Sequence, residues 1–280
     1  MFDIFDIYIR QHNFLVCVDN DSCTMDTMAI KHVQYFGPCM VEEWGLEQWQ
    51  EPILDRWNEI NLYTMTRGVN RFRGLRIALE EIHSRYIPIE GVEELAAWVD
   101  KTGELSNVSL EQEIGHGGGV CLQKALHWSQ MADQAIAAIP EGMKRPFFGV
   151  REGLAAAYTV ADVAVLSSVD KDIAAAEWSR YGLTEYVDLL LARDAGTRGH
   201  CVAKLLKKGY DSKNVLLVGS TPGDMAVARK NGVRFYPILV HHEAESWNEF
   251  REIALDKLIS GTYEDYGRKK MAEFCNNLGV

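Results

Sequence analysis

The sequence predicts an α/β fold in which a parallel sheet forms the core and an α-helical domain is inserted into that core. Short continuous apolar runs occur once near the start of the chain and repeatedly after residue 160. Helical patterns alternate with the later runs, and between the first run and the second the strand pattern gives way to helical periodicity. Strands that alternate with helices are typical of βαβ units with right-handed connections.

Each apolar run has the length and composition of a strand buried on both faces of a parallel sheet. The first is Phe14–Asp19, and the later ones are Val163–Ser168, Val187–Ala192, Asn214–Ser220 and Arg234–Val240. The predicted helices between them contain Ile173, Ala176 and Trp178, cover His200–Lys208, and cover Asp224–Lys230 with an end at Asn231 and Gly232. Ligands of such sheets bind at the carboxyl ends of the strands, so functional residues are expected there.

The inserted segment has two apolar stripes at helical spacing. The first consists of Leu75, Ala78, Leu79, Ile82 and Tyr86, and the second of Leu122, Ala125, Leu126, Ala132, Ala135, Ile136 and Ile139. A further helical stripe near the C-terminus consists of Trp247, Phe250, Ala254 and Leu258. We therefore predict a core domain of residues 1–26 and 147–280 and a helical domain of residues 27–146.

The composition is that of an ordinary globular protein, with 47% apolar and 25% charged residues. The formal net charge is −11, so the average surface repels nucleic acid and anionic membranes. The longest apolar stretch, Leu154–Leu166, is shorter than the roughly 20 residues that span a bilayer. Neither nucleic acid nor a membrane is therefore an expected partner.

Two features predict a cytoplasmic protein. The N-terminal segment has acidic residues among its apolar ones and lacks the basic start and small-residue cleavage site of a secretory signal. The six cysteines are scattered with no CxxC pair, which favours reduced thiols over disulfides or a zinc site.

Polar residues follow the predicted strands in a pattern that suits phosphoryl chemistry. Asp19 and Asp21 stand two residues apart after the first run, where one carboxylate can attack phosphorus while the other handles protons. The second run ends in Ser167 and Ser168, and a hydroxyl there can hold a phosphoryl oxygen. Arg198 precedes the helix before the fourth run, and Asp224 follows that run.

This order resembles the phosphatases of the haloacid dehalogenase superfamily over the whole chain. Those proteins carry DxDx(T/V), then Ser or Thr, then Lys or Arg, then an acidic GDxxxD-type motif, all at strand ends of a Rossmann-like core. The resemblance implies that Asp19 is the nucleophile and Asp21 the general acid and base. It further implies that Ser167 and Arg198 bind the phosphoryl group, with Ser168 as a neighbouring substrate-binding candidate.

The resemblance also implies Mg²⁺ as a cofactor, held by Asp19, Asp21, Asp224 and the residue at position 220. The family usually has Asp at that position, whereas this chain has Ser220. Mg²⁺ prefers charged oxygens in octahedral geometry, so the hydroxyl is expected to weaken its binding. Ser22 and Cys23 also replace the usual Gly and Thr or Val of the first motif.

The helical insertion occupies the place of the family's C1-type cap, which selects the substrate. Within it, Arg67 and Arg71 are candidates for binding an oxyanion, since Arg does so with two parallel hydrogen bonds. The alternative is that these cations form a solvated, salt-bridged face.

The function implied is a Mg²⁺-dependent phosphatase that acts on a small phosphorylated metabolite through an aspartyl-phosphate. Two alternatives stay open: a non-catalytic phosphate-ligand binder with a degenerate metal site, and a phosphomutase similar to β-phosphoglucomutase. A dehalogenase is less favoured because that branch generally lacks the second Asp of the first motif, which is Asp21 here. The sequence specifies neither the substrate nor the oligomeric state.

Overall fold

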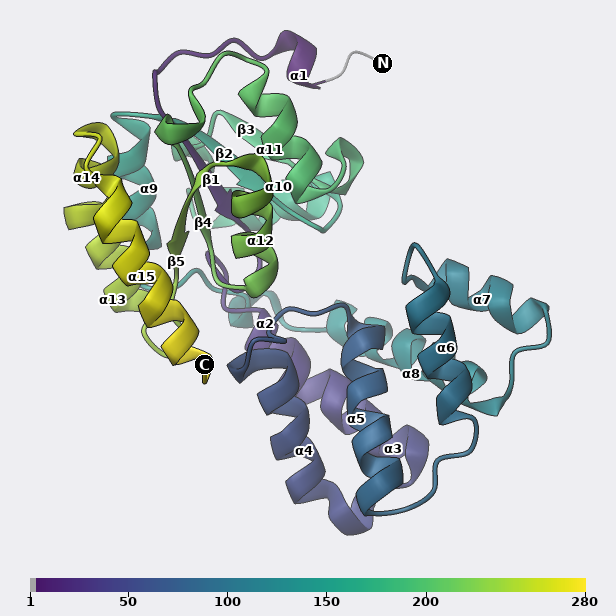
Figure 1. Cartoon of the computed structure of the whole chain (residues 1–280). Coiled ribbons are helices and arrows are strands. Elements are labelled where there is room, and N and C mark those ends of the chain that lie inside the picture. The colour runs from purple at the N-terminus through teal and green to yellow at the C-terminus, as the bar shows by residue number, and fades with distance from the viewer. Residues whose placement is uncertain (1–3) are drawn as a thin grey trace. The chain divides into compact units, whose positions relative to one another are not determined.

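The computed structural model describes residues 4–280, and the chain divides into two compact units (Figure 1). Unit 1 consists of Met1–Thr27 and Lys144–Val280, and unit 2 consists of Met28–Met143. The chain therefore leaves unit 1 soon after its first strand and returns to it before the second.

Unit 1 is built on a five-stranded sheet with the order β3-β2-β1-β4-β5. The strands are β1 (Leu15–Asp19), β2 (Asp162–Leu166), β3 (Leu189–Leu191), β4 (Val215–Gly219) and β5 (Arg234–Pro237). All four neighbouring pairs are parallel. The predicted α/β fold with a Rossmann-like parallel core is confirmed, and β1 is the central strand.

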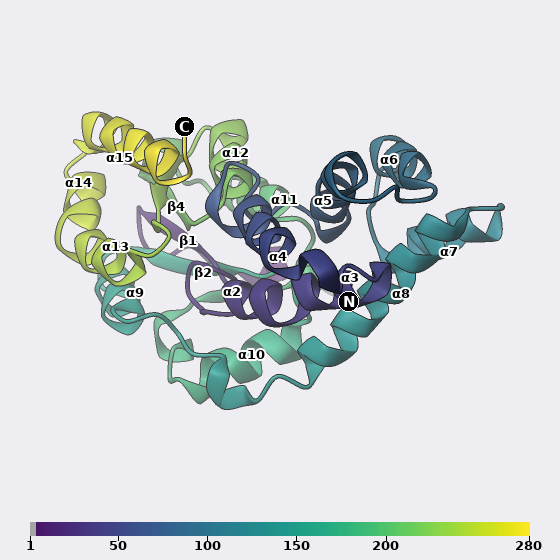
Figure 2. The same cartoon turned by 90° about the horizontal axis from the view of Figure 1, so that it is seen from below.

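Helices cover both faces of this sheet. They are α1 (Ile4–Ile7), α9 (Val150–Tyr158), α10 (Lys171–Arg180), α11 (Arg198–Leu206), α12 (Pro222–Asn231), α13 (Glu243–Glu249), α14 (Leu255–Ile259) and α15 (Tyr263–Asn277). Short 3₁₀ turns lie at Thr184–Tyr186, Arg193–Ala195 and Ser212–Asn214, and a π-helical segment joins α13 to α14 at Phe250–Ala254. Helices α9 and α13–α15 lie on one face, and α11 and α12 on the other (Figures 1 and 2).

Burial on both faces explains why the strands read as continuous apolar runs. Every residue of β1, β2 and β4 is buried. Val16 and Val18 pack in one apolar cluster with Trp247 and Phe250 from the C-terminal helices. Each large side chain buried in this way stabilises the fold by roughly 1.5–3 kcal/mol.

Unit 2 is helical throughout its described residues. Its helices are α2 (Met28–Lys31), α3 (Gly37–Trp44), α4 (Gln50–Asn58), α5 (Arg71–Arg85), α6 (Val92–Lys101), α7 (Asn107–Gly115) and α8 (Val120–Ala137). Two π-helical segments, His32–Phe36 and Glu59–Tyr63, and two 3₁₀ turns, Glu47–Trp49 and Glu141–Met143, complete it. The core is aromatic, and the Trp128 ring packs against Phe36, Trp57 and Phe72.

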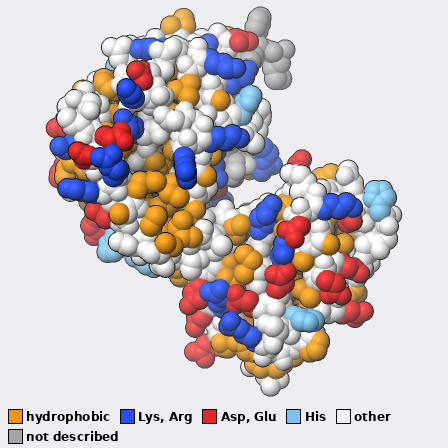
Figure 3. Space-filling model, viewed as in Figure 1, with side chains coloured by type: hydrophobic (Ala, Val, Ile, Leu, Met, Phe, Trp, Pro, Cys, Tyr) orange, Lys and Arg blue, Asp and Glu red, His pale blue; other side chains and the backbone are white. Residues whose placement is uncertain are grey.

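The described residues can also be examined for membrane-spanning helices, for disulfides and for charged patches on the surface. No helix within residues 4–280 is long and apolar enough to cross a membrane. All six cysteines are free thiols. Acidic and basic side chains are interspersed over the visible face of each unit, and no continuous basic strip is seen on that face (Figure 3).

Candidate active site

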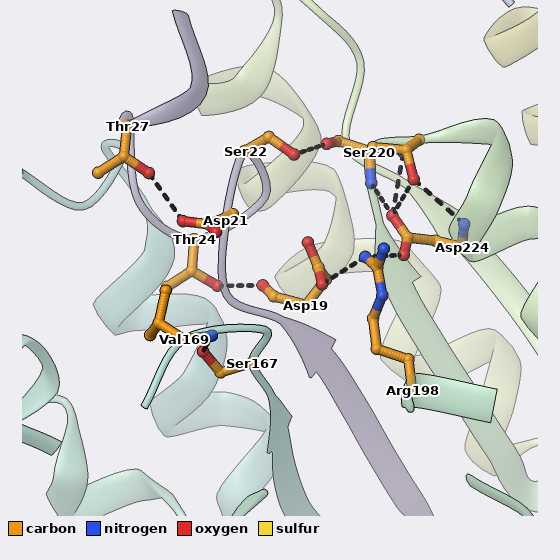
Figure 4. Close-up of polar contacts among 11 residues, drawn as sticks. Asp19, Asp21, Ser22, Thr24, Thr27, Ser167, Val169, Arg198, Ser220 and Asp224 are labelled. Atoms are coloured by element: carbon orange, nitrogen blue, oxygen red, sulfur yellow. Dashed lines mark hydrogen bonds and ion pairs between the residues drawn. The ribbon is translucent and has the colours of Figure 1, made fainter. Parts of the chain in front are cut away.

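Three strand ends of unit 1 meet at one edge of the sheet and carry the predicted polar residues (Figure 4). Asp19 is the last residue of the central strand β1, and it pairs in register with Leu166, the last residue of β2. Ser167 follows β2 directly, and Ser220 follows β4. The parallel arrangement thus brings together residues that are far apart in the sequence.

The loop after β1 is fixed by hydrogen bonds that the sequence did not predict. The Thr24 hydroxyl donates to the backbone carbonyl of Asp19 at 2.9 Å. The Trp178 indole donates to the Asn20 side chain at 2.6 Å, and the Trp247 indole donates to the Cys23 carbonyl at 2.9 Å. This loop therefore has little freedom, and it holds the carboxylates of the first motif in place.

Arg198 joins two carboxylates of the site. It is the first residue of α11, whose N-terminus is capped by the Thr197 side chain. One guanidinium nitrogen, Nη1, donates to Asp19 Oδ1 at 2.7 Å and to Asp224 Oδ1 at 2.6 Å. The other oxygen of Asp19 points away from Arg198 (Figure 4). Asp19 is 4% exposed, so the carboxylate of this ion pair is withdrawn from water, whereas the Arg198 side chain is 33% exposed.

The environment of Asp19 opposes its ionisation. Burial raises the pKa of Asp19 well above its usual range, and the carboxylates of Asp224 and Asp21 raise it further, against the lowering effect of Arg198. The two carboxylates beside Arg198 in turn raise the pKa of its guanidinium, which stays charged. Asp19 is thus a buried carboxyl with one cationic partner, a combination common at functional sites.

Asp224 is held by the start of its own helix. Its Oδ2 accepts hydrogen bonds from the Ser220 N–H at 3.2 Å, the Thr221 N–H at 3.1 Å and the Thr221 hydroxyl at 2.7 Å. The Asp224 N–H donates back to the Thr221 hydroxyl at 3.1 Å, which completes a capping box at the start of α12. Together with the bond from Arg198, this engages both carboxylate oxygens of Asp224 with groups of the chain.

Ser220 contacts the first motif. Its hydroxyl lies 2.6 Å from that of Ser22, and both side chains are buried. Ser22 has a φ of 62°, the left-handed region that glycine adopts most easily. Ser22 stands where the family resemblance leads us to expect Gly, so the turn holds a strained residue, and its hydroxyl links the loop after β1 to the end of β4.

Asp21 and Ser167 lie beside Asp19 on the neighbouring segments. The Thr27 hydroxyl donates to Asp21 Oδ1 at 2.9 Å, and Asp21 is half-buried. Ser167 is 4% exposed, and its hydroxyl accepts the N–H of Val169 at 3.3 Å. Ser168 is exposed, and its carbonyl accepts a hydrogen bond from Arg193 at 3.0 Å. Of the two serines, Ser167 is thus the one next to the loop of the first motif.

The two arginine candidates lie in unit 2 and differ in their surroundings. Arg67 is 6% exposed, and its Nη1 donates to the Leu62 carbonyl at 2.8 Å. Arg71 donates to the Asp133 carboxylate at 2.5 Å and to the Ser129 hydroxyl at 3.1 Å. Arg71 thus has the salt-bridged surroundings that the sequence left open as an alternative, and substrate binding by either arginine stays a prediction.

Solved structures match the chain over most of its length. A haloacid dehalogenase-like hydrolase from Streptococcus pneumoniae is 11% identical, with a TM-score of 0.48 over 84% of this chain and 90% of that one. A HAD family hydrolase from Deinococcus radiodurans, with bound phosphate and sodium, is 15% identical, with a TM-score of 0.47 over 81% of each chain. A HAD-superfamily hydrolase from Geobacter sulfurreducens is 16% identical, with a TM-score of 0.43 over 81% of this chain and 88% of that one.

No family model matches the chain, and no curated protein matches its sequence. These three structural matches combine low identity with TM-scores below 0.5, so the function has to be inferred from the geometry of the site.

The side chains present do not fit the Mg²⁺ site that the family resemblance implies. Within residues 4–280, no group of three or more His, Cys, Asp or Glu is arranged to hold a metal ion. Asp224 has both oxygens engaged by chain groups, and the Ser220 hydroxyl is bonded to Ser22. We therefore derive no step of the chemistry through a metal ion.

Proposed function

We propose that unit 1 is the catalytic domain of a hydrolase of the haloacid dehalogenase type that cleaves a phosphate monoester through a phosphoryl group bound to Asp19. One observation carries this proposal: Asp19 ends the central strand with one oxygen bonded to Arg198 and the other pointing away from it (Figure 4). A carboxylate oriented in this way can act as a nucleophile, and covalent catalysis divides one difficult step into two easier ones.

In the first step, Asp19 attacks the phosphorus atom and the bond from phosphorus to the ester oxygen breaks. Asp21 in its acid form gives its proton to the departing alcohol. The hydrogen bond from Thr27 orients the Asp21 carboxyl for this transfer. In the second step, Asp21 takes a proton from water, and the resulting oxygen attacks phosphorus, so inorganic phosphate leaves and Asp19 is regenerated.

Arg198 and Ser167 would stabilise the transferring group. Phosphoryl transfer depends mainly on positioning and on charge stabilisation, because little other chemistry is required of the protein. Arg198 is 33% exposed, and N–H groups beyond Nη1 are suited to phosphoryl oxygens. The Ser167 hydroxyl, at the end of the neighbouring strand, is a second donor. The substrate, a small phosphorylated metabolite, would bind between these groups.

Phosphate release from a panel of phosphorylated metabolites and a chromogenic phosphate ester tests this proposal. The panel is measured for the parent protein and for Asp19→Asn, both with added Mg²⁺ and with EDTA. The matched control is Asp172→Asn, an exposed Asp on α10 outside the site. We expect turnover in the parent and the control and none in Asp19→Asn. Equal turnover in Asp19→Asn would contradict the proposal.

Product analysis in the same assay separates hydrolysis from transfer within a substrate. Release of inorganic phosphate and alcohol in equal amounts is expected of the hydrolase. An isomeric phosphate ester without free phosphate would indicate a phosphomutase instead.

A further inference from the structure

We propose that the β4 end of this site holds Arg198 where the family resemblance places a divalent cation, so that Asp224 is a positioning residue for Arg198 and neither Asp224 nor Ser220 is a cation ligand. The part that concerns catalysis rests on the hydrolase function proposed above. The part that concerns cation binding is independent of turnover.

The hydrogen bonds of Asp224 leave it poorly suited to bind a cation. Its Oδ2 accepts three hydrogen bonds, from two backbone N–H groups and the Thr221 hydroxyl. A cation that bound this oxygen would have to displace donors that also start helix α12. Mg²⁺ demands near-ideal octahedral geometry, so it does not share an oxygen that is already surrounded by donors.

The remaining oxygen of Asp224 is occupied by Arg198. The same Nη1 bonds Asp224 Oδ1 at 2.6 Å and Asp19 Oδ1 at 2.7 Å, so it lies between the two carboxylates that a bridging cation would join. A divalent ion at this place would meet the guanidinium charge at close range, and such repulsion is strong in a site largely withdrawn from water.

The charge of Asp224 is also compensated without a cation. Asp224 lies in the first turn of α12, a helix of 10 residues, where the free N–H groups favour an anion. Asp224 is 0% exposed, so this local compensation replaces the solvation that the carboxylate loses.

Ser220, at the end of β4, has a structural role. Its hydroxyl is 2.6 Å from the Ser22 hydroxyl, and it is 0% exposed. A neutral hydroxyl that is engaged in this way adds no charge to attract a divalent ion. The consequence is that Asp224 and Ser220 both stabilise contacts within the chain, and Asp224 fixes the guanidinium that faces Asp19.

The cation part is tested by titrating Mn²⁺ and following its electron paramagnetic resonance signal. The proteins are the parent, Asp224→Asn, Ser220→Ala and Ser220→Asp. We expect the Mn²⁺ dissociation constants of Asp224→Asn and Ser220→Ala to lie within about threefold of the parent value. If the parent does not bind Mn²⁺, neither of these variants should bind it. Ser220→Asp adds a carboxylate, but the Arg198 guanidinium still lies between Asp19 and Asp224, so the affinity for Mn²⁺ should again change by less than about threefold.

Two results would overturn this part. One is a larger than threefold weakening in Asp224→Asn or Ser220→Ala, which would make that residue a ligand. The other is a larger than threefold gain in affinity in Ser220→Asp, which would show that a divalent cation can bind beside Arg198.

The positioning part is tested by combining Asp224→Asn with Arg198→Ala. The Asn side chain can still accept the capping hydrogen bonds, but it lacks the charge that holds Arg198. We expect Asp224→Asn to lower kcat by about tenfold, with a smaller change in KM, and to have no further effect in the Arg198→Ala background. An equal loss in both backgrounds would show that Asp224 does not act through Arg198.

Thr221→Val is the matched control for helix capping. It removes both hydrogen bonds between the Thr221 hydroxyl and Asp224 but keeps the carboxylate that faces Arg198. We expect a lower Tm with no loss of kcat comparable to that of Asp224→Asn. A comparable loss would assign the effect to capping and overturn the positioning role. If no phosphate ester is turned over, the proposed function fails, and the Mn²⁺ titration still decides the cation part.

Discussion

The sheet of unit 1 has one buried carboxylate at the amino ends of its strands and another at their carboxyl ends. The two carboxylates differ in the hydrogen-bond donors and charges that surround them. At the amino end, Asp162 begins β2 and is 1% exposed. At the carboxyl end, Asp19 ends β1 and is 4% exposed. Similar burial on neighbouring strands thus allows the surroundings of the two carboxylates to be compared directly.

Asp162 is surrounded by donors. Its oxygens accept hydrogen bonds from the backbone N–H groups of Gln11 and His12, each at 3.1 Å, and from the Tyr210 hydroxyl, and they lie 3.0 Å from the His12 ring nitrogen. Burial by itself would raise the pKa of Asp162, but these hydrogen bonds lower it below the ordinary value. This carboxylate is therefore stabilised as an anion, and its place in the fold is structural.

For Asp19, the effects that raise the pKa outweigh those that lower it. Its side chain bonds Arg198, while burial and the carboxylates of Asp224 and Asp21 raise its pKa. A buried carboxyl group whose ionisation the fold opposes is consistent with a functional role, since perturbed pKa values cluster at active sites. Burial alone therefore does not distinguish a structural from a functional carboxylate, whereas the hydrogen-bond donors around it do.

The largest expected effect separates the two carboxylates by activity. We expect Asp19→Asn to lower turnover by at least about a thousandfold, because the amide cannot attack phosphorus. Asp162→Asn, at the other end of the sheet, should leave turnover at 25 °C within a few-fold of the parent. Steady-state phosphate release measures both, and similar losses in the two variants would break the comparison.

Removal of Arg198 should have the next largest effect. We expect Arg198→Ala to lower kcat by about a hundredfold, since one preorganised charge at the phosphoryl group is lost. Arg198 also lowers the pKa of Asp19, so its removal raises that pKa further, and less of the nucleophile is ionised at a given pH. The acid limb of the pH–rate profile should therefore move to higher pH. An unmoved limb would show that Arg198 does not act on Asp19.

Unfolding experiments distinguish the two carboxylates by stability. We expect Asp162→Asn to lower the free energy of unfolding by about 2–3 kcal/mol at pH 7, because charged hydrogen bonds are lost. The native pKa of Asp162 is lowered, so this contribution is complete above its ordinary pKa of about 3.9 and disappears as pH falls through the native value. The gap between parent and variant should narrow below pH 4 in urea unfolding curves.

In the same unfolding experiment, we expect the change in the free energy of unfolding for Asp19→Asn to have the opposite sign to that for Asp162→Asn. A raised native pKa means that the ionised form destabilises the fold at neutral pH. Asp19→Asn should therefore unfold at equal or higher urea than the parent at pH 7. Destabilisation of both variants by the same amount would contradict the difference between Asp162, which the fold stabilises as an anion, and Asp19, whose ionisation the fold opposes.

Ser167→Ala is expected to have the smallest effect. The loss of one hydrogen bond to the phosphoryl group is worth about 1 kcal/mol, so kcat/KM should fall by roughly fivefold. Ser168→Ala is the matched control, because that side chain is exposed and lies one residue further from the strand. A larger loss in Ser168→Ala would exchange the assignments of the two serines.

Much of the fold was predictable because its strands are buried on both faces. The run Phe14–Asp19 corresponds to β1 at Leu15–Asp19, and the run Asn214–Ser220 corresponds to β4 at Val215–Gly219. The third run was overestimated, since β3 covers only Leu189–Leu191. Asp188 lies outside that strand and instead accepts the backbone N–H of Val163 through its side chain. The apolar pattern does not reveal such a contact.

The place of the site in the sheet was predictable, but the hydrogen bonds between its side chains were less so. The places of Asp19, Ser167 and Ser220 at the strand ends were predictable because these residues lie at or near the ends of apolar runs. The capping box of Asp224 had a local signal in Thr221, followed by Pro222 at the first helical position, which the interpretation as a metal ligand overlooked. The bond between Ser22 and Ser220 had none, because it joins residues 198 positions apart through the pairing of β1 with β4.

The most direct test of the central claim is to trap the phosphoryl group on Asp19. The protein is mixed with a phosphate ester that it turns over, quenched in acid during the steady state, and digested for peptide mass spectrometry. We expect one phosphoryl group on the peptide that contains Asp19, labile to hydroxylamine and absent from Asp19→Asn. Turnover of the ester without a phosphoryl group at Asp19 would contradict it.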